Sequence, residues 1–376
     1  MLTDSASRRT ILSVVGTRPN FMKTVPVIAA IGRRPEEVRH VLVHTGQHYD
    51  DAMSRIFLEE LGVGEPDYSL DVGSGSHAQQ TARVMERLEP ILLEVQPDIV
   101  LVPGDVNSTL AAALVAAKLG IPIGHIEAGL RSFDRTMPEE LNRVVADSLS
   151  DYLFIHSPEA RENLLREGAN PESIHAVGNT MIDTLVTMLP RIEALGAPAA
   201  HGLRPGSYLV VTLHRPALVD GPLLADALEQ LQALSRELTV VFPAHPRTRK
   251  AMAMLGVAEG DERFRIIDPV GYLEFLGLVR YAAGVLTDSG GIQEETTFLG
   301  VPCFTLRDNT ERPVTLTLGT NTLLGLAPER ISTVPGLLAA AGRRSEVPPG
   351  WDGQAAERIA DVLLTVPVKG RYQWVP

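Results

Sequence analysis

Short apolar runs alternate with amphipathic stretches along almost the whole chain. In the first half the runs predict strands at 10–15, 38–44, 98–102, 121–126 and 152–155. The segments between them predict helices, for example at 21–31, 78–95 and 109–118, because their apolar positions recur every three or four residues. Strands that alternate with helices indicate βαβ units, in which helices cover both faces of a parallel sheet.

A second series of strands is predicted at 208–213, 238–242, 264–267, 283–286 and 301–305. Between the two series, segment 190–205 is rich in Ala, Gly and Pro and is interpreted as a linker. A chain of 376 residues is also longer than one typical domain. We therefore expect an α/β fold with two doubly wound domains, divided somewhere between about 177 and 205.

Unusual polar clusters follow many of these strands. Arg18 follows the first strand, Asp105 and Glu127 follow two others, and His214 and His245 follow strands of the second series. Open α/β sheets bind ligands at the carboxyl ends of their strands. The clusters are therefore expected to meet in one cleft between the two domains.

Ser289, Gly290 and Gly291 stand between an apolar run at 282–286 and a predicted helix at 292–299. Free N–H groups at the start of a helix, together with its dipole, bind phosphate. Glu294 or Glu295, one turn further on, would accept hydrogen bonds from a ribose, as acidic residues do in Rossmann folds. The alternative is an ordinary strand-to-helix turn with a serine cap.

Each of the other clusters also has a purely structural alternative. Arg18 is interpreted either as a ligand or as a surface cation, and His214 either as a site residue or as a core histidine. Asp105 is interpreted either as an acid–base group or as a helix N-cap, and segment 138–143 as a helix start. Taken together they favour a site: the cations suit a diphosphate and the carboxylates suit proton transfer at a nearby carbon. The cations are Arg18, Arg131, Arg143, Arg215 and Arg247, and the carboxylates are Asp105, Glu127 and Glu139.

Composition narrows the function classes. A formal net charge of −12 argues against a general nucleic-acid binder. The single cysteine, Cys303, excludes an intrachain disulfide and is expected to be a buried, unreactive thiol. The polar start of the chain does not resemble a signal peptide, and no apolar run is long enough for a membrane span, so we expect a cytoplasmic enzyme. No metal is expected, because the acidic residues and histidines lack ligand spacing.

The motifs in order resemble the non-hydrolysing UDP-N-acetylglucosamine 2-epimerases from about residue 10 to 364. The resemblance rests on Gly16-Thr17-Arg18-Pro19 with Lys23, Gln47-His48, Gly104-Asp105, His125 to Arg131, Pro138-Glu139-Glu140 with Asn142-Arg143, Gly178-Asn179-Thr180, His214-Arg215, Asp288 to Glu295, Thr310-Glu311-Arg312-Pro313, and Asp352 to Ala355. It implies a GT-B-like fold of two Rossmann-like domains facing across a cleft. The expected domains are 1–180 with a C-terminal helix at about 355–376 that crosses back to it, and 181–354.

The resemblance also implies an activity and a role for each site residue. Family members interconvert UDP-GlcNAc and UDP-ManNAc by eliminating UDP to a glycal and adding it back, without a cofactor, and the family suggests a homodimer. By this resemblance Asp105, Glu127 and Glu139 are the acid–base groups, and His214 binds phosphate or orients a carboxylate. The expected substrate-binding residues are Arg18, Lys23, Arg143, His245, Ser289, Gly290, Gly291 and Glu295.

Three departures from the family pattern bear on the substrate. Asn20 stands where glutamate is common, Pro216 follows His214-Arg215 where arginine is common, and Arg247 changes a usual histidine-asparagine-proline loop. An allosteric nucleotide site and the exact sugar therefore stay open. So do a hydrolysing reaction that releases ManNAc and UDP, and a modified UDP- or TDP-linked amino sugar. A GT-B glycosyltransferase would not need the three carboxylates, and a sensor would have no use for intact catalytic residues.

Overall fold

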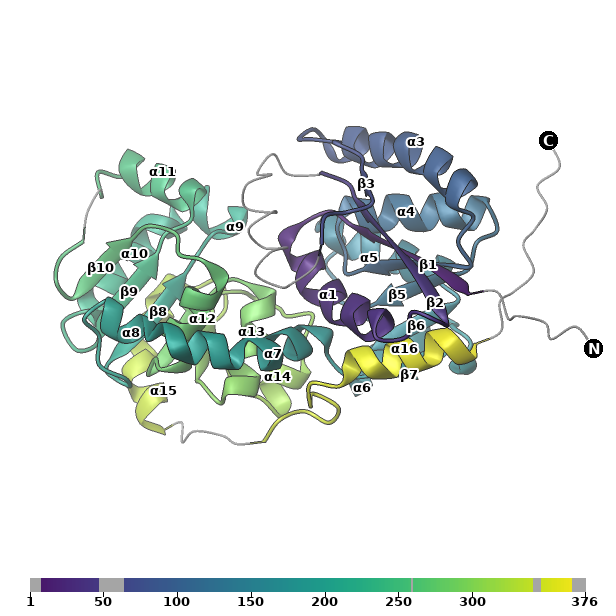
Figure 1. Cartoon of the computed structure of the whole chain (residues 1–376). Helices are drawn as coiled ribbons and strands as arrows, with labels where there is room; N and C mark the ends of the chain where they lie inside the picture. Colours follow the sequence, from purple (N-terminus) through teal and green to yellow (C-terminus); the bar gives the residue numbers. More distant parts are fainter. Residues whose placement is uncertain (1–7, 47–63, 258–259, 341–345, 367–376) are drawn as a thin grey trace, which may run out of the picture. The chain divides into compact units, whose positions relative to one another are not determined.

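The computed structural model describes residues 8–46, 64–257, 260–340 and 346–366 (Figure 1). The chain divides into two compact units. The first comprises Met1–Thr184 and Pro349–Pro376, and the second comprises Leu185–Pro348. The sequence places these boundaries at 180/181 and 354/355. Each unit is a parallel α/β sheet with helices on both faces, so the predicted fold class of two Rossmann-like domains is confirmed.

Within its described residues, the first unit contains a seven-stranded parallel sheet in the order β3-β2-β1-β4-β5-β6-β7. The strands are β1 (Arg9–Val15), β2 (Val38–His44), β3 (Tyr68–Ser69), β4 (Ile99–Pro103), β5 (Ile123–Ile126), β6 (Tyr152–Ile155) and β7 (Ile174–Ala176). The order reverses between β1 and β4, because β2 and β3 lie on one side of β1 and the later strands lie on the other. Such a switch point is where open α/β sheets bind ligands.

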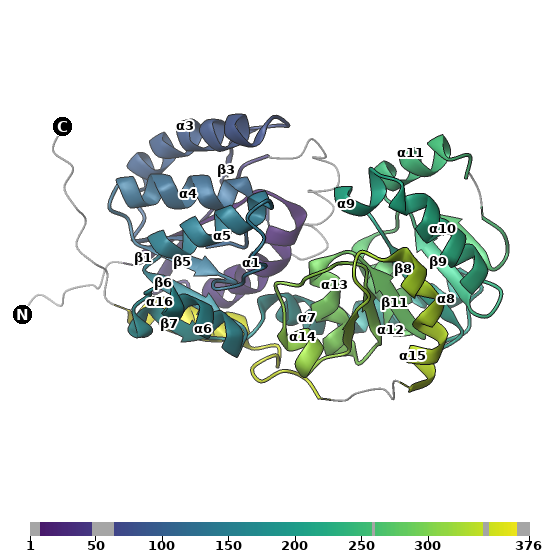
Figure 2. The same ribbon diagram turned by 180° about the vertical axis from the view of Figure 1, so that it is seen from behind.

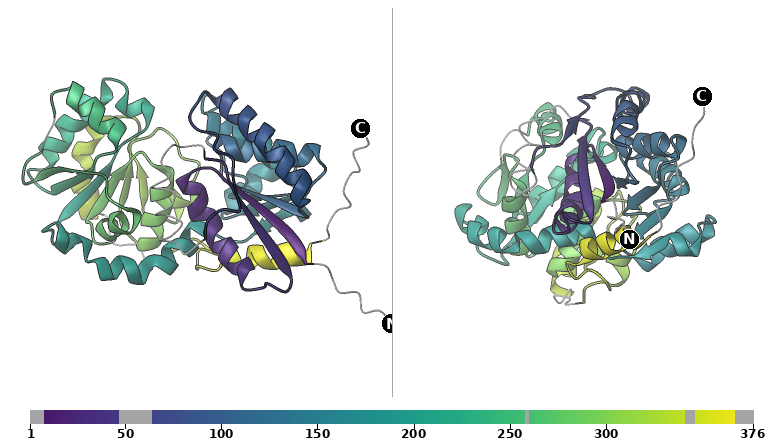
Figure 3. Two further views of the ribbon diagram at one scale, coloured as in Figure 1. Left: turned by 45° about the horizontal axis from the view of Figure 1, so that its top comes forward. Right: turned by 45° about the vertical axis from the view of Figure 1, so that its right-hand side comes forward.

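Two sets of helices cover this sheet (Figures 1 and 2). Apolar residues of α3 (His77–Val95), α4 (Asn107–Lys118) and α5 (Pro138–Leu149) pack on one face. Those of α1 (Arg18–Gly32) and α16 (Ala355–Thr365) pack on the other. The remaining elements are α6 (Pro158–Arg166) and η1 (Pro171–Ser173). The C-terminal helix thus belongs to the first unit, as expected, and lies beside α1 in both views of Figure 3.

The second unit contains, in its described part, a six-stranded parallel sheet ordered β10-β9-β8-β11-β12-β13. This is the Rossmann order 3-2-1-4-5-6, with its switch point between β8 and β11. The strands are β8 (Tyr208–Thr212), β9 (Thr239–Pro243), β10 (Phe264–Ile267), β11 (Gly284–Thr287), β12 (Cys303–Thr305) and β13 (Asn321–Leu323).

Helices again cover both faces of this second sheet. One face packs against α9 (Pro216–Val219), α10 (Leu223–Leu234), α11 (Pro246–Met254), η2 (Pro328–Thr333) and α15 (Val334–Ala340). The other packs against α8 (Ala197–Ala200), α12 (Tyr272–Arg280) and α13 (Gly290–Leu299). The short helix α14 (Val314–Thr317) precedes β13.

The predicted linker at 190–205 is wrong for most of its length. Helix α7 (Thr180–Leu195) spans the division between the units and continues through Pro190, and α8 follows it. Leu185, Met188 and Ile192 are buried along α7 at helical spacing. This apolar stripe outweighs the local cost of one proline, since tertiary packing supplies most of a helix's stability.

Cys303 lies on β12 and is completely buried, as expected. Burial raises the pKa of its thiol to about 11, so the thiol is protonated and unreactive at neutral pH. In the part of the chain that the structure describes, no helix has both the length and the apolar character needed to cross a membrane.

Candidate functional site

Asp105 lies at the switch point of the first sheet, two residues after β4 ends. Its carboxylate is partly exposed, at 26%, and forms an ion pair with Arg143 of α5. Helix α4 begins at Asn107 with Val106 as its N-cap, so the alternative in which Asp105 caps the helix is wrong. The Asp105 carboxylate is held by another side chain and still reaches solvent, as a reacting group must.

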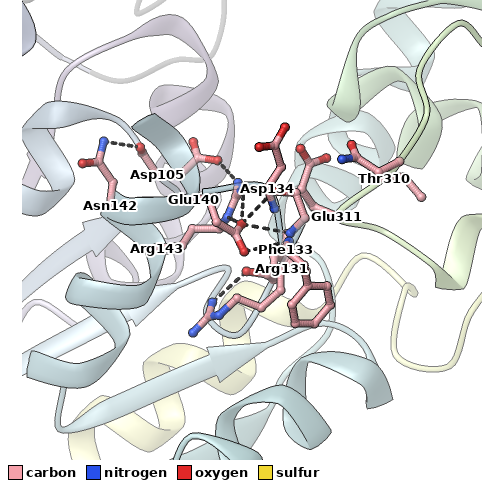
Figure 4. A network of polar contacts seen from close by, with 12 residues as sticks. Asp105, Arg131, Phe133, Asp134, Glu140, Asn142, Arg143, Thr310 and Glu311 are labelled. Carbon is pink, nitrogen blue, oxygen red and sulfur yellow. Dashed lines mark hydrogen bonds and ion pairs between the residues drawn. The ribbon is translucent and has the colours of Figure 1, made fainter. Parts of the chain in front are cut away.

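Arg143 connects Asp105 to Glu140, a buried residue that lies on α5 together with Arg143 (Figure 4). The Arg143 Nη2 donates to Glu140 Oε2 over 2.9 Å. Glu140 also accepts hydrogen bonds from the backbone N–H groups of Ser132 and Phe133, each at 2.9 Å. Burial alone would raise the pKa of the Glu140 carboxyl, but the Ser132 N–H and Arg143 outweigh it and hold the pKa below its ordinary value.

Glu139, the predicted acid–base residue, precedes Glu140 in the first turn of α5. It is partly exposed and makes no hydrogen bond or ion pair with the described residues. The interpretation of Pro138 as a helix start is also correct, since α5 begins there with both glutamates in its first turn. The start of this helix thus presents one glutamate outward and buries the other.

Lys23 and Glu127 form a buried ion pair at the same edge of the sheet. Lys23 is on α1 and Glu127 follows β5, and their side chains are only 6% and 7% exposed. Gly104, with φ of +63°, lies against them: a Cβ there would come within 2.8 Å of Lys23 Nζ. Glu127 itself has φ of +70°, which is uncommon for a residue with a side chain and is found at functional sites.

The loop between β1 and α1 leads into the first turn of α1, which carries Arg18 and Asn20. Arg18 is the exposed first residue of α1. Asn20 is buried; its Oδ1 accepts from the N–H groups of Gly16 and Thr17, over 3.1 and 3.2 Å. The Asn20 amide therefore ties this loop together.

His125, Asp147 and Arg131 form a buried network behind these residues. Asp147 lies 2.7 Å from His125 Nδ1 and 2.7 Å from Arg131 Nη1. Burial would raise the pKa of the Asp147 carboxyl, but His125 and Arg131 lower it below its ordinary value. Because Arg131 is buried and also bonded to Glu167, its prediction as a cation for a diphosphate is wrong. His125 opens the motif His125 to Arg131, but no role was expected for it or for Asp147, because the pair joins residues 22 positions apart in the sequence.

In the second unit, Ser289 is the N-cap residue of α13, at the switch point of the sheet. Its hydroxyl makes no capping hydrogen bond, so the interpretation of Ser289 as an ordinary side-chain cap is wrong. Gly290 leaves room for a guanidinium, since a Cβ there would lie 2.6 Å from Arg312 Nη1. Arg312 is in turn bound to Glu294, with Nε 2.8 Å from Oε2. The helix start thus presents Ser289, Gly290 and Gly291 with an arginine packed beside them.

Glu294 and Glu295 point to different partners. Glu294 is fully buried against Arg312, whereas Glu295 Oε1 accepts a hydrogen bond of 2.9 Å from the hydroxyl of Tyr272. Of the two alternatives for a ribose contact, Glu294 is therefore occupied by an internal ion pair. The role of Glu295 at the ribose, which the family resemblance implies, stays a prediction.

Asp288 holds the loop that carries His214. Its Oδ2 accepts from the backbone N–H groups of His214 and Arg215, both at 2.8 Å, and its Oδ1 lies 3.1 Å from His214 Nδ1. His214 is 39% exposed, so the alternative of a core histidine is wrong. The His245 ring centroid lies 6.1 Å from that of His214. Burial, and after it His214 and Arg247, lower the pKa of His245.

The structure therefore gathers the predicted residues at two sheet edges. Arg18, Lys23, Asp105, Glu127, Glu139 and Arg143 lie at the carboxyl edge of the first sheet. His214, His245, Ser289, Gly290, Gly291 and Glu295 lie at the carboxyl edge of the second. Arg247 is exposed and paired with Asp220. The Gln47-His48 motif lies outside the described residues.

Comparisons with known proteins agree with this arrangement. A family model described as UDP-N-acetylglucosamine 2-epimerase matches residues 30–364. The UDP-N-acetylglucosamine 2-epimerase of Methanococcus maripaludis is 44% identical over 93% of this chain and 97% of its own length. The UDP-2,3-diacetamido-2,3-dideoxy-D-glucuronate 2-epimerase of Pseudomonas aeruginosa is 41% identical over 94% of this chain and 99% of its own length. The crystal structure of Methanocaldococcus jannaschii UDP-GlcNAc 2-epimerase in complex with UDP-GlcNAc and UDP matches with a TM-score of 0.85 at 40% identity, covering 94% of this chain and 99% of that one.

Proposed function

The chain belongs to the UDP-N-acetylglucosamine 2-epimerase family, and from this premise we propose that it interconverts UDP-GlcNAc and UDP-ManNAc. The supporting observation is that each sheet carries, at its switch point, the chemistry that one half of this reaction needs. The first sheet carries the carboxylates of Asp105 and Glu127, and the second carries the N-terminus of α13.

The reaction has to make an unreactive C–H bond acidic. The C2 proton of the sugar is not adjacent to a carbonyl, so direct deprotonation is too slow. When UDP leaves C1, that carbon gains oxocarbenium character and the C2 proton becomes acidic. Its removal gives a glycal and UDP. Protonation of C2 from the opposite face and return of UDP to C1 then give the epimer.

The second unit would stabilise the leaving diphosphate. At the positive end of α13, Gly290 and Gly291 would offer backbone N–H groups and Ser289 its hydroxyl, and by the family resemblance Arg18 would add a cation. His214 would contact phosphate, and Glu295 the ribose hydroxyls. Groups arranged in advance around developing charge are usually the largest single contribution to catalysis.

The first unit would move the protons. We assign removal of the C2 proton to Asp105 and its return on the other face to a glutamate, Glu127 or Glu139. The Asp105 carboxylate is partly exposed and is held in place by Arg143. To return the proton, Glu127 would act as a neutral carboxylic acid, and Lys23 beside it would balance the carboxylate charge that results.

A proton NMR time course with UDP-GlcNAc in D₂O tests this function. Appearance of UDP-ManNAc, with deuterium at C2 of both sugars, is the expected result. Free UDP with ManNAc would instead identify the hydrolysing reaction. Asp105→Asn should slow turnover by on the order of 10²–10⁴-fold while UDP still binds; full activity of this variant would overturn the assignment of the base.

A modified sugar is the second candidate. The basis is that the relative from P. aeruginosa, whose name specifies a diacetamido glucuronate, is 41% identical over nearly the full chain. The same NMR assay with that UDP sugar distinguishes the two. The substrate with the larger kcat/KM identifies the function, and exchange with neither would count against both.

A further inference from the structure

The backbone that leads into Asp105 is held in an unusual way. Three successive carbonyl groups, those of Pro103, Gly104 and Asp105, each accept a hydrogen bond from a side chain. The donors are Asn20 Nδ2 at 3.0 Å, His125 Nε2 at 2.7 Å and Asn142 Nδ2 at 2.8 Å, and Thr109 Oγ1 also donates to the Pro103 carbonyl at 2.6 Å. Asn20, His125 and Asn142 come from α1, β5 and α5, so the loop after β4 is bonded to three separate elements.

The histidine in this set has a defined orientation. A carbonyl oxygen can only accept, so His125 Nε2 carries a proton toward Gly104. The other ring nitrogen, Nδ1, lies 2.7 Å from Asp147, which holds the ring from behind. The N–H of Gly104 donates to the carbonyl of Ile126 over 2.9 Å. The Gly104 residue is therefore bonded through both its N–H and its C=O.

We propose that Asn20, His125 and Asn142 are positioning residues that set the geometry of Asp105 for its reaction. This inference rests on the proposed function, in which Asp105 removes the C2 proton. Surface loops ordinarily have mobile backbones, whereas a proton-transfer group must be within hydrogen-bond reach of its target. Arg143 holds the Asp105 carboxylate, and the three donors hold the backbone from which that side chain extends.

Asn142→Ala, with Asn163→Ala as its control, tests the proposal. Asn163 also donates its side-chain amide to a loop carbonyl of the same unit, that of Gly129 at 3.0 Å, but it does not contact residues 103–105. Both variants lose a hydrogen bond from an asparagine amide to a loop carbonyl, and Asn142→Ala also loses a longer one, of 3.4 Å, to Asn107 Oδ1. Because a misplacement of about 1 Å costs on the order of 10²-fold in rate, we expect Asn142→Ala to lower kcat by about 10- to 100-fold with KM nearly unchanged. The primary deuterium isotope effect at C2 should rise, and Asn163→Ala should change neither value.

Two further measurements complete the test. Asn20→Ala removes the donor to Pro103 together with the acceptor for the N–H groups of Gly16 and Thr17, and it should also lower kcat more than the control does. This variant keeps the proposal testable where Asn142→Ala does not fold. Hydrogen exchange of the Gly104 amide should be faster in both variants than in Asn163→Ala, and this readout does not depend on activity.

An inactive wild-type enzyme would count against the proposed function alone. An active enzyme in which neither variant lowers kcat more than the control, or in which KM rises and kcat does not fall, would overturn the positioning role.

Discussion

Among individual residues, Lys23 and Glu127 make the interaction with the clearest energetic consequence. Both side chains are almost fully buried and they form an ion pair. Removing one partner of a buried pair leaves a charge that protein atoms solvate poorly, at a cost of about 3–5 kcal/mol. Lys23→Met should therefore strongly destabilise the first unit in urea unfolding, and Lys23→Met combined with Glu127→Gln should recover much of that loss. Glu127→Gln alone completes the cycle, and a double variant whose loss equals the sum of the two single losses would show that the two side chains are not energetically coupled.

Single residues also show that the sequence alone does not predict which way a side chain points. The Pro138-Glu139-Glu140 motif predicts a glutamate at the site, and only the rotation of α5 decides that Glu140 faces inward to the N–H groups of Ser132 and Phe133. The same holds for Arg131, whose position after β5 is as suggestive as that of Arg143. The direction of a side chain depends on its packing partners, and those are distant in sequence. Residue type and strand ends thus locate the site but do not assign every role.

At the scale of elements, Asp183 joins α7 to the C-terminal helix. Its carboxylate accepts from the backbone N–H groups of Ala355 and Ala356 at the start of α16. Burial raises the pKa of Asp183 from its ordinary value of 3.8 to about 6, against the opposing effect of those two N–H groups. The folded chain therefore holds this proton more tightly than the unfolded chain does.

The sign of the resulting pH dependence follows by linkage. Between about pH 4 and 6 the unfolded state loses the Asp183 proton while the folded state keeps it. The contribution of Asp183 to the free energy of unfolding therefore falls as pH rises, by on the order of 3 kcal/mol in total, and it does not change further above pH 6. Urea unfolding of the wild type and of Asp183→Asn from pH 4 to 7 measures this contribution. The stability of the wild type relative to the variant should fall over this range. The exposed Asp226→Asn serves as the control, and an equal pH trend for both variants would contradict the expectation.

Element boundaries follow from the sequence wherever burial and periodicity agree. Strands β2, β6 and β10 have the predicted limits. The short strands β3, β7 and β13 are absent from the prediction, because two or three residues at or near a sheet edge carry no periodic signal. The opposite failure occurred in α7, where Pro190 and nearby Ala residues concealed an amphipathic helix.

For the whole molecule, alternation of strands and helices predicts parallel sheets, whereas the strand order within each sheet depends on which crossovers pack best. The structure has the same order of the first six strands in both units. That shared order places a switch point in each unit, and the polar clusters after β1, β4, β8 and β11 lie there. The two sheet edges that carry the candidate residues therefore follow from the recognition of two Rossmann-like domains, and their function as one site stays a prediction.

The two units also predict how the whole chain unfolds. Ile359 of α16 is completely buried in the core of the first unit, and Leu231 of α10 in that of the second. Truncating either to alanine should cost about 2–5 kcal/mol, and in calorimetry each variant should lower the transition of its own unit. If the second unit carries the nucleotide site, UDP at 100 times its Kd should raise the free energy of unfolding of that unit by about 2.7 kcal/mol. The transition that rises should be the one that Leu231→Ala lowers. A single transition lowered equally by both variants would mean instead that the units unfold together, and nucleotide binding would then stabilise the entire chain.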